Sequence, residues 1–275
     1  MLYSYEQTAL LHQQTFAHLR VVESEHRLNL SLDRPEKKNA LNPTLLNELA
    51  YALSYAHHQT NIRVVVLSAN GSVFCAGADL KSFGGGNESE ALSTIPPPPQ
   101  QPIIGDLFAQ LHKPCIARLH APVYAGGLLL VCGCLYVVTT EATFFDLPEV
   151  KRGLFPMQVM QSLLQVMPAR RVLDWCIRAR RLYAPEALRE GLVTHLVAND
   201  TELDTTIDGI CSDICQNSPT AIRMGLKAYD GLRSRTAAEA HAYLSDMLLQ
   251  TLQTQDAIEG IKAFQQKRSP VWTGK

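Results

Sequence analysis

The chain has 275 residues, of which 46% are hydrophobic, and its formal net charge is −1. This near-neutral charge gives no electrostatic reason to expect nucleic-acid binding, and the length and apolar fraction are those of a globular protein with a sizeable core. The seven cysteines are an odd number and several lie in or beside apolar runs, so we expect reduced packing residues and no disulfide framework.

The sequence contains no segment that predicts export or membrane insertion. Residues 1–16 lack a basic start and an apolar centre, and the longest apolar stretch, 123–138, is too short to span a membrane. Cys132 and Cys134 are closely spaced and have no further ligand cluster, so we expect no metal site. We therefore expect a cytoplasmic protein with no membrane partner.

The first two thirds of the chain alternate between strand and helix signals. Leu28–Leu32 alternates like a strand, and Asn42-Pro43 is a typical helix start. Arg63–Ser68 and Pro114–His120 then follow as apolar strands. This order predicts a parallel sheet covered by helices.

Two later segments do not show this alternation of strand and helix signals. Residues 84–99 run from three glycines to four prolines and predict a linker, or alternatively a lid. Beyond Pro156 the pattern becomes helical, with one helix expected to start at Ser218-Pro219 and the last to run from Leu252 to Gln266.

Two segments of small residues follow the two apolar strands. Residues 72–81 crowd small side chains around Gly77, and residues 123–130 place Gly126 at the start of an apolar helix. Backbone N–H groups in such segments can approach a ligand closely and hold a developing oxyanion. The alternative is an ordinary loop and tight glycine packing of a helix on the sheet, and periodicity does not separate these two readings.

Five segments in order resemble the crotonase superfamily, also called the enoyl-CoA hydratase/isomerase family, from about Leu19 to the C-terminus. These segments are Arg34–Asn42, Phe74–Lys81, Ala125–Gly127, Leu147–Leu154 and Glu259–Arg268. The resemblance implies an α/β fold with a crotonase-like spiral β/α core and a helical C-terminal trimerisation region. It divides the chain into an N-terminal extension (1–17), an acyl-CoA-binding core (18–200) and a helical region (201–275), assembled as a homotrimer or hexamer.

The resemblance also implies roles for individual residues. Ala78 and Gly126 would supply two N–H groups that polarise the thioester C=O of an acyl-CoA, which is substrate and not cofactor, so no cofactor is expected. The CoA portion would contact residues close to Ala78 and Gly126. It would also contact residues near the C-terminus, which would belong to a neighbouring subunit. These contacts are Ala76, Asp79, Leu80, Phe264 and Lys267, with Tyr124 as an auxiliary candidate that is otherwise a packed residue.

The acid/base position is where this sequence becomes specific. Hydratases of the family place one carboxylate three residues after the Gly126 position and another at the Glu149 position. Here the first is Leu129 and the second is retained, so Glu149 is the expected general acid/base. One carboxylate is enough to move a proton between carbons 2 and 4 of an enoyl chain, whereas hydration needs something else to orient water.

Two other groups of activities in the family are disfavoured by single residues of this chain. Dienoyl isomerases and aryl dehalogenases of the family carry an Asp where this chain has Met157, and ring-closing members lack the Glu149 carboxylate, so both are disfavoured. Asp146 near Glu149 is expected to be a loop-capping residue. The alternatives to an enoyl-CoA hydratase or isomerase are a non-catalytic acyl-CoA-binding protein and an acyl-carrier-protein-linked dehydratase or decarboxylase.

Overall fold

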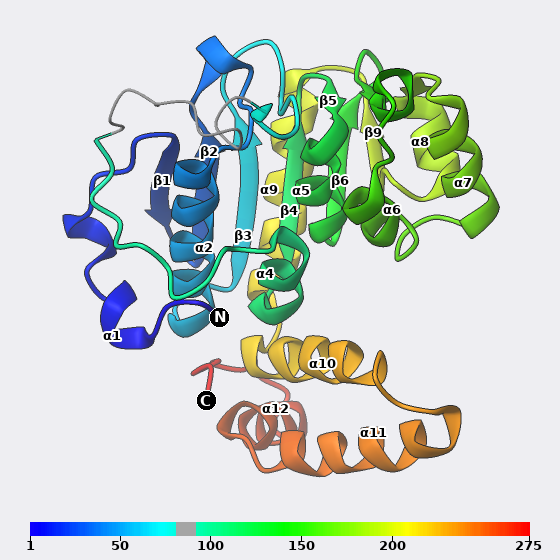
Figure 1. Cartoon of the computed structure of the whole chain (residues 1–275). Helices are drawn as coiled ribbons and strands as arrows, with labels where there is room; N and C mark the ends of the chain where they lie inside the picture. The colour runs from blue at the N-terminus through cyan, green and yellow to red at the C-terminus, as the bar shows by residue number, and fades with distance from the viewer. Residues whose placement is uncertain (81–91) are drawn as a thin grey trace.

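The computed structural model describes residues 1–80 and 92–275. Its centre is a six-stranded sheet in the order β1-β2-β3-β4-β6-β9, in which only the β1–β2 pair is antiparallel (Figure 1). A small second sheet has the order β5-β7-β8. The strands are β1 (Leu19–Ser24), β2 (Arg27–Leu32), β3 (Val64–Ala69), β4 (Cys115–Leu119), β5 (Val123–Tyr124), β6 (Tyr136–Thr140), β7 (Phe144–Asp146), β8 (Leu182–Tyr183) and β9 (His195–Val197).

Helices cover the large sheet and continue beyond it to the C-terminus. The α-helices are α1 (Tyr5–Thr8), α2 (Pro43–His58), α4 (Ile104–Leu111), α5 (Leu128–Gly133), α6 (Met157–Leu163), α7 (Ala169–Arg178), α8 (Ala184–Glu190), α9 (Asp200–Gln216), α10 (Pro219–Leu232), α11 (Ala237–Leu252) and α12 (Gln255–Gln265). Short 3₁₀ turns are η1 (Leu11–Gln13), η2 (Pro35–Lys37), η3 (Ala125–Gly127) and η4 (Glu149–Arg152). Among the helices of the described residues, none is long and apolar enough to cross a membrane.

The sheet is buried on both faces, as expected for parallel strands covered by helices. In β3 the side chains of Val65 and Leu67 join the large core that includes α2, whereas Val64 and Val66 join a second core. This second core is closed by the apolar face of α9. The alternation of side chains along a strand therefore divides one apolar run between two cores.

The predicted helix starts and strands are confirmed in most places. Asn42 and Ser218 are the N-caps of α2 and α10, each accepting a hydrogen bond from a backbone N–H in the first turn. The expected last helix from Leu252 to Gln266 was wrong at its start: Leu252 ends α11, and α12 begins after the N-cap Thr254. The Thr254 side chain accepts from the Ala257 N–H, which starts a new helix after a short turn.

Two strands interrupt the part of the chain beyond Pro156 that was expected to be helical. They are β8 and β9, which have only two and three residues and pair with β7 and β6. Strands this short carry almost no periodic signal, so the sequence pattern could not reveal them.

The last three helices, α10, α11 and α12, form a separate layer below the sheet in Figure 1. Apolar side chains on α11 and α12 remain exposed, Phe264 reaching 85%. Residues 1–17 pack against α2 through the buried Tyr3 and Leu11. Of the expected linker or lid at 84–99, residues 84–91 lie outside the described residues, whereas Pro96 accepts hydrogen bonds from Tyr3 and Asn47.

Candidate active site

The two small-residue segments lie side by side at the ends of β3 and β4. Cys75 forms a parallel bridge with Val123, and the Tyr124 N–H donates to the Cys75 carbonyl at 2.9 Å. A second parallel bridge joins Leu41 to Ala78. Leu41 bonds to the residues on either side of Ala78, so the N–H of Ala78 itself points away from Leu41.

Glycines allow this close approach. Gly77 has a φ of +87°, and a Cβ added to it would lie 2.7 Å from the Ala125 Cβ and 2.9 Å from the Gly126 nitrogen. A Cβ on Gly127 would lie 2.8 Å from the Cβ of Cys75. Both positions therefore exclude any larger residue, for reasons of space and, at Gly77, also of backbone conformation.

Gly126 lies in the first turn of η3, just before α5. Backbone N–H groups in a first helical turn lack partners within the helix and carry the positive end of its dipole. A Cβ on Gly126 would lie only 3.5 Å from the Ala78 nitrogen, which places the two backbone segments in contact. Ala78 and Gly126 line the same cavity.

The cavity has a volume of about 670 Å³ and a mainly apolar wall. Besides the two amide positions it is lined by Ala76, Leu80 and Glu149, so five of the predicted site residues share one space. Its other described polar residues are Gln101, Arg152 and Gln158.

Glu149 is the only carboxylate among the described residues that line this cavity. It opens the 3₁₀ turn η4, and its Oε2 is buried without a hydrogen-bond partner in the described part of the chain. Burial raises the pKa of Glu149 and Asp146 raises it further, while a backbone hydrogen bond and Arg152 oppose the shift. A carboxyl in a cavity can take a proton from a bound molecule and return it.

Leu129 also lines the cavity, so an apolar side chain occupies the position of the second carboxylate that is expected of a hydratase. Met157 lines the same space.

Four predicted site residues do not line the cavity. Asp79 pairs with the buried Arg34, with 2.8 Å between Oδ2 and Nη1. The ring of Tyr124 packs edge-on against Phe144, at 5.7 Å between centroids. The two C-terminal positions are exposed: Phe264 in α12 and Lys267 just beyond it.

The structure adds one residue of importance that the sequence reasoning missed. Asn39 is fully buried, and its amide donates to the carbonyls of Asn70 and Val73, each at 2.8 Å. It thereby fixes the turn that leads into the Gly77 segment. Asn39 lies inside the Arg34–Asn42 segment, and nothing in its spacing indicated this contact.

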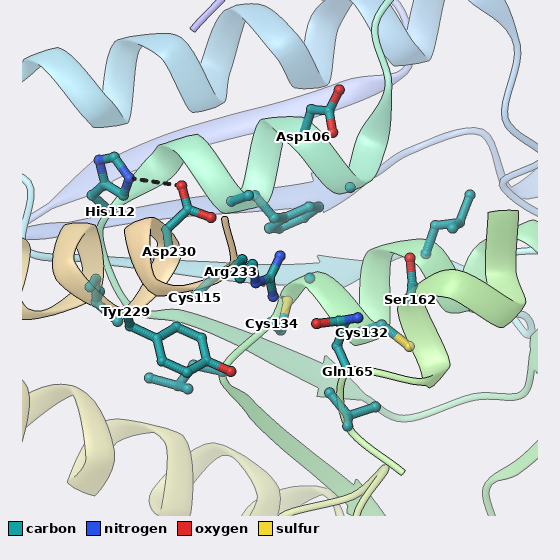
Figure 2. Close-up of a pocket in the computed structure, with 18 of the residues that line it drawn as sticks. Asp106, His112, Cys115, Cys132, Cys134, Ser162, Gln165, Tyr229, Asp230 and Arg233 are labelled. Carbon is teal, nitrogen blue, oxygen red and sulfur yellow. Dashed lines mark hydrogen bonds and ion pairs between the residues drawn. The ribbon is translucent and has the colours of Figure 1, made fainter. Parts of the chain in front are cut away.

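A second cavity of about 340 Å³ lies between α4, α5, α6 and α10 (Figure 2). Its wall is more polar, and His112 lies 3.7 Å from Asp230 across the space between α4 and α10. Of the described residues, Leu129 alone lines both cavities. The amides of Ala78 and Gly126 and the carboxylate of Glu149 belong to the first cavity only.

Comparison with known proteins identifies the fold and the family. A crystal structure of an enoyl-CoA hydratase from Mycobacterium tuberculosis matches with a TM-score of 0.81 at 28% identity, covering 94% of this chain and 100% of that one. The fold is therefore the crotonase fold, an α/β core followed by a helical region. The family model described as enoyl-CoA hydratase/isomerase matches residues 25–275. The chain belongs to the enoyl-CoA hydratase/isomerase family.

Individual relatives extend over nearly the whole chain. YngF of Bacillus subtilis, named as an enoyl-CoA hydratase/isomerase, is 31% identical over 258 residues, covering 93% of this chain and 98% of that protein. The enoyl-CoA hydratase domain-containing protein 3 of Xenopus laevis is 28% identical over 260 residues, covering 93% of this chain and 86% of that protein.

Proposed function

We propose that the protein is an enoyl-CoA isomerase that moves a double bond from carbon 3 to carbon 2 of an acyl-CoA thioester. The observation that carries this proposal is one cavity lined by Ala78, by Gly126 and, among the described residues, by a single carboxylate, Glu149. A 1,3-proton transfer needs one group that takes a proton and gives it back, and a pair of donors for the charge that develops in between.

The proposed reaction has two proton transfers. The ionised Glu149 removes a proton from carbon 2 of a 3-enoyl thioester, and the electron pair moves to the thioester oxygen as a dienolate. The N–H groups of Ala78 and Gly126 donate to this oxygen, where one such donor is typically worth about 3–4 kcal/mol in the transition state. The protonated Glu149 then returns the proton to carbon 4, and the double bond becomes conjugated with the thioester.

Hydration of a 2-enoyl thioester is the second candidate. It is favoured by relatives whose names include enoyl-CoA hydratase. Water would then need a partner other than a second carboxylate, because Leu129 occupies that position. This is why we place isomerisation first.

The proposal includes the rest of the substrate and the assembly. Ala76 and Leu80 line the cavity and would lie along CoA. The exposed Phe264 and Lys267 would contact the nucleotide end on a neighbouring subunit of a homotrimer or hexamer. The protein would act without a cofactor in the cytoplasm, and free CoA is favoured over an acyl-carrier protein if this C-terminal contact exists.

Two substrates separate the candidates in a spectrophotometer. Purified protein is incubated with a 3-enoyl-CoA and, separately, with crotonyl-CoA, while the absorbance of the conjugated thioester is followed. A gain with the first means isomerisation and a loss with the second means hydration. Tight binding of acyl-CoA without either change, or activity only on a carrier-protein thioester, would reject the proposal.

Glu149→Gln tests the acid/base. We expect a loss of about 10²–10⁴-fold in kcat for whichever activity is found, because glutamine cannot accept the proton. Glu141→Gln is the matched control, since Glu141 is exposed in the turn between β6 and β7. Retained activity in Glu149→Gln would mean that another group moves the proton.

A further inference from the structure

The small sheet β5-β7-β8 joins three segments near the candidate active site. Strand β5 ends at Tyr124, directly before the turn that contains Gly126, and β7 ends at Asp146, three residues before Glu149. Tyr124 is paired with Asp146 in the parallel β5–β7 register. Strand β8 begins directly after Arg181 and pairs with β7 in the opposite direction. Gly126 and Glu149 therefore lie in the 3₁₀ turns that follow two neighbouring strands.

Side chains on one face of this sheet form a stack. The ring of Phe144 lies edge-on to Tyr124 at 5.7 Å and to Tyr183 at 6.3 Å between centroids. The guanidinium carbon of Arg181 lies 3.7 Å from the centre of the Phe144 ring. A cation this close to a ring is attracted by its π face, so the stack holds Arg181 in place.

Arg181 also faces Asp146. Its Nη2 lies 3.8 Å from Asp146 Oδ2, and Asp146 is largely buried, with 16% of its side chain exposed. Oδ1 of Asp146 is buried and, like Oε2 of Glu149, makes no hydrogen bond within the described residues. The titratable and charged groups that act on Glu149 are Asp146 and Arg152 from its own segment, and the thiol of Cys176 lies close to it on the packed helix α7.

We propose that Arg181 is a positioning residue for the Glu149 acid/base: stacked on Phe144 and facing Asp146, it fixes the end of β7 and balances the charge of the carboxylate nearest to Glu149 in sequence. This inference rests on the proposed role of Glu149. It goes beyond it because Arg181 is not among the residues that line the cavity. Its effect reaches Glu149 through Asp146 and through the end of β7.

The expected consequence is a change in the proton affinity of Glu149. The negative charge of Asp146 already raises the pKa of Glu149. Without Arg181 this charge is no longer balanced by a nearby cation, so the pKa of Glu149 rises further. The acid limb of kcat/KM moves to higher pH by the same amount, while KM on the plateau changes less than about twofold.

The test is a titration of the Glu149 carboxyl by NMR on full-length protein with ¹³C-labelled glutamate, the signal being assigned by its loss in Glu149→Gln. It compares wild type, Arg181→Gln, Asp146→Asn and the double variant. We expect Arg181→Gln to raise the midpoint, Asp146→Asn to lower it, and the double variant to lie between the two. Arg180→Gln is the matched control, because Arg180 binds Glu186 through two hydrogen bonds, at 2.8 and 2.6 Å.

Each outcome decides the inference. An unchanged midpoint in Arg181→Gln overturns it, and an unchanged midpoint in Asp146→Asn overturns the part that Asp146 plays in it. If Arg181→Gln fails to fold, judged by circular dichroism, Arg181→Lys serves instead: it retains the charge but loses the planar stack, and is expected to keep the midpoint within about 0.3 unit of wild type. Because the titration needs no turnover, it stays informative if no enoyl-CoA is converted, which would reject the proposed function alone.

Discussion

The sheet-based part of the molecule and the layer of α10, α11 and α12 differ in how they cover their apolar side chains. Strands of the large sheet have both faces covered by helices of the same chain. In contrast, α11 and α12 leave Leu248, Ile261 and Phe264 exposed. The first region also leaves single apolar side chains exposed, such as Ile177, whereas in the second they follow one another along two helices, a surface of the kind that a partner can cover. The candidate active site lies in the sheet-based region.

Gly77 offers the largest test of whether the sheet-based region carries the chemistry. We expect Gly77→Ala to reduce kcat by about 10²–10³-fold, because the added methyl displaces the segment that presents the Ala78 N–H. The measurement is kcat with the active enoyl-CoA. Gly209→Ala in α9 is the control, since its Cβ would meet nothing within 4 Å. Equal activity in both variants would show that the Gly77 segment is not part of the reaction.

The C-terminal layer is tested by placing a charge on its exposed apolar surface. We expect Phe264→Asp to lower the assembled mass toward that of one chain, and to raise KM for acyl-CoA several-fold with kcat nearly unchanged. Light scattering and steady-state kinetics measure the two effects. Ile177→Asp on α7, an apolar position of the sheet-based region that is 63% exposed against 85% for Phe264, is expected to leave both unchanged. If the two variants behave alike, the difference between the regions has no functional meaning.

A smaller effect concerns pH. Because burial raises the pKa of Glu149 above its ordinary value of 4.5, the ionised base becomes available only at higher pH. We therefore expect kcat/KM to rise with pH along a limb centred above 4.5, and this limb to be absent from any residual activity of Glu149→Gln. A limb at or below 4.5 would mean that the burial of Glu149 is relieved in solution.

The smallest expected effect is on stability. The raised pKa means that the folded chain binds the Glu149 proton more tightly than the unfolded chain does, so ionisation at neutral pH favours unfolding. Glu149→Gln removes this cost and should raise Tm by about 1–3 °C at pH 7, after allowance for solvent screening. The gain should vanish well below pH 4.5, where the carboxyl is protonated in both states. Thermal unfolding at the two pH values checks the sign.

The sequence predicted those parts of the molecule that depend on local pattern. The strands around Leu30 and Val66 and the caps at Asn42 and Ser218 follow from periodicity and side-chain hydrogen bonding, and all are present. The short strands β8 and β9 could not be predicted, because two or three residues become a strand only when a neighbour pairs with them.

In the candidate site, the residues that belong to motifs were predicted, whereas the contacts between distant segments were not. Ala78, Gly126 and Glu149 came from motifs and share one cavity. The contacts of Asn39 with the turn before Gly77, and of Arg181 with Asp146, join positions 31 to 35 residues apart, and spacing in the chain carries no record of them. The role of each residue in catalysis remains a prediction.

Helix α9 has a consequence for how this chain can be divided. It lies at the boundary proposed at residue 200, yet Leu203 and Ile207 belong to the second core with Val64 and Val66. Polar bonds reinforce this contact: Arg118 binds Asp204, Arg27 binds Asp208 and Arg63 donates to the Cys215 carbonyl. A fragment that stops at residue 200 would expose one whole face of the sheet to water, so the shortest chain that keeps both cores extends through Gln216.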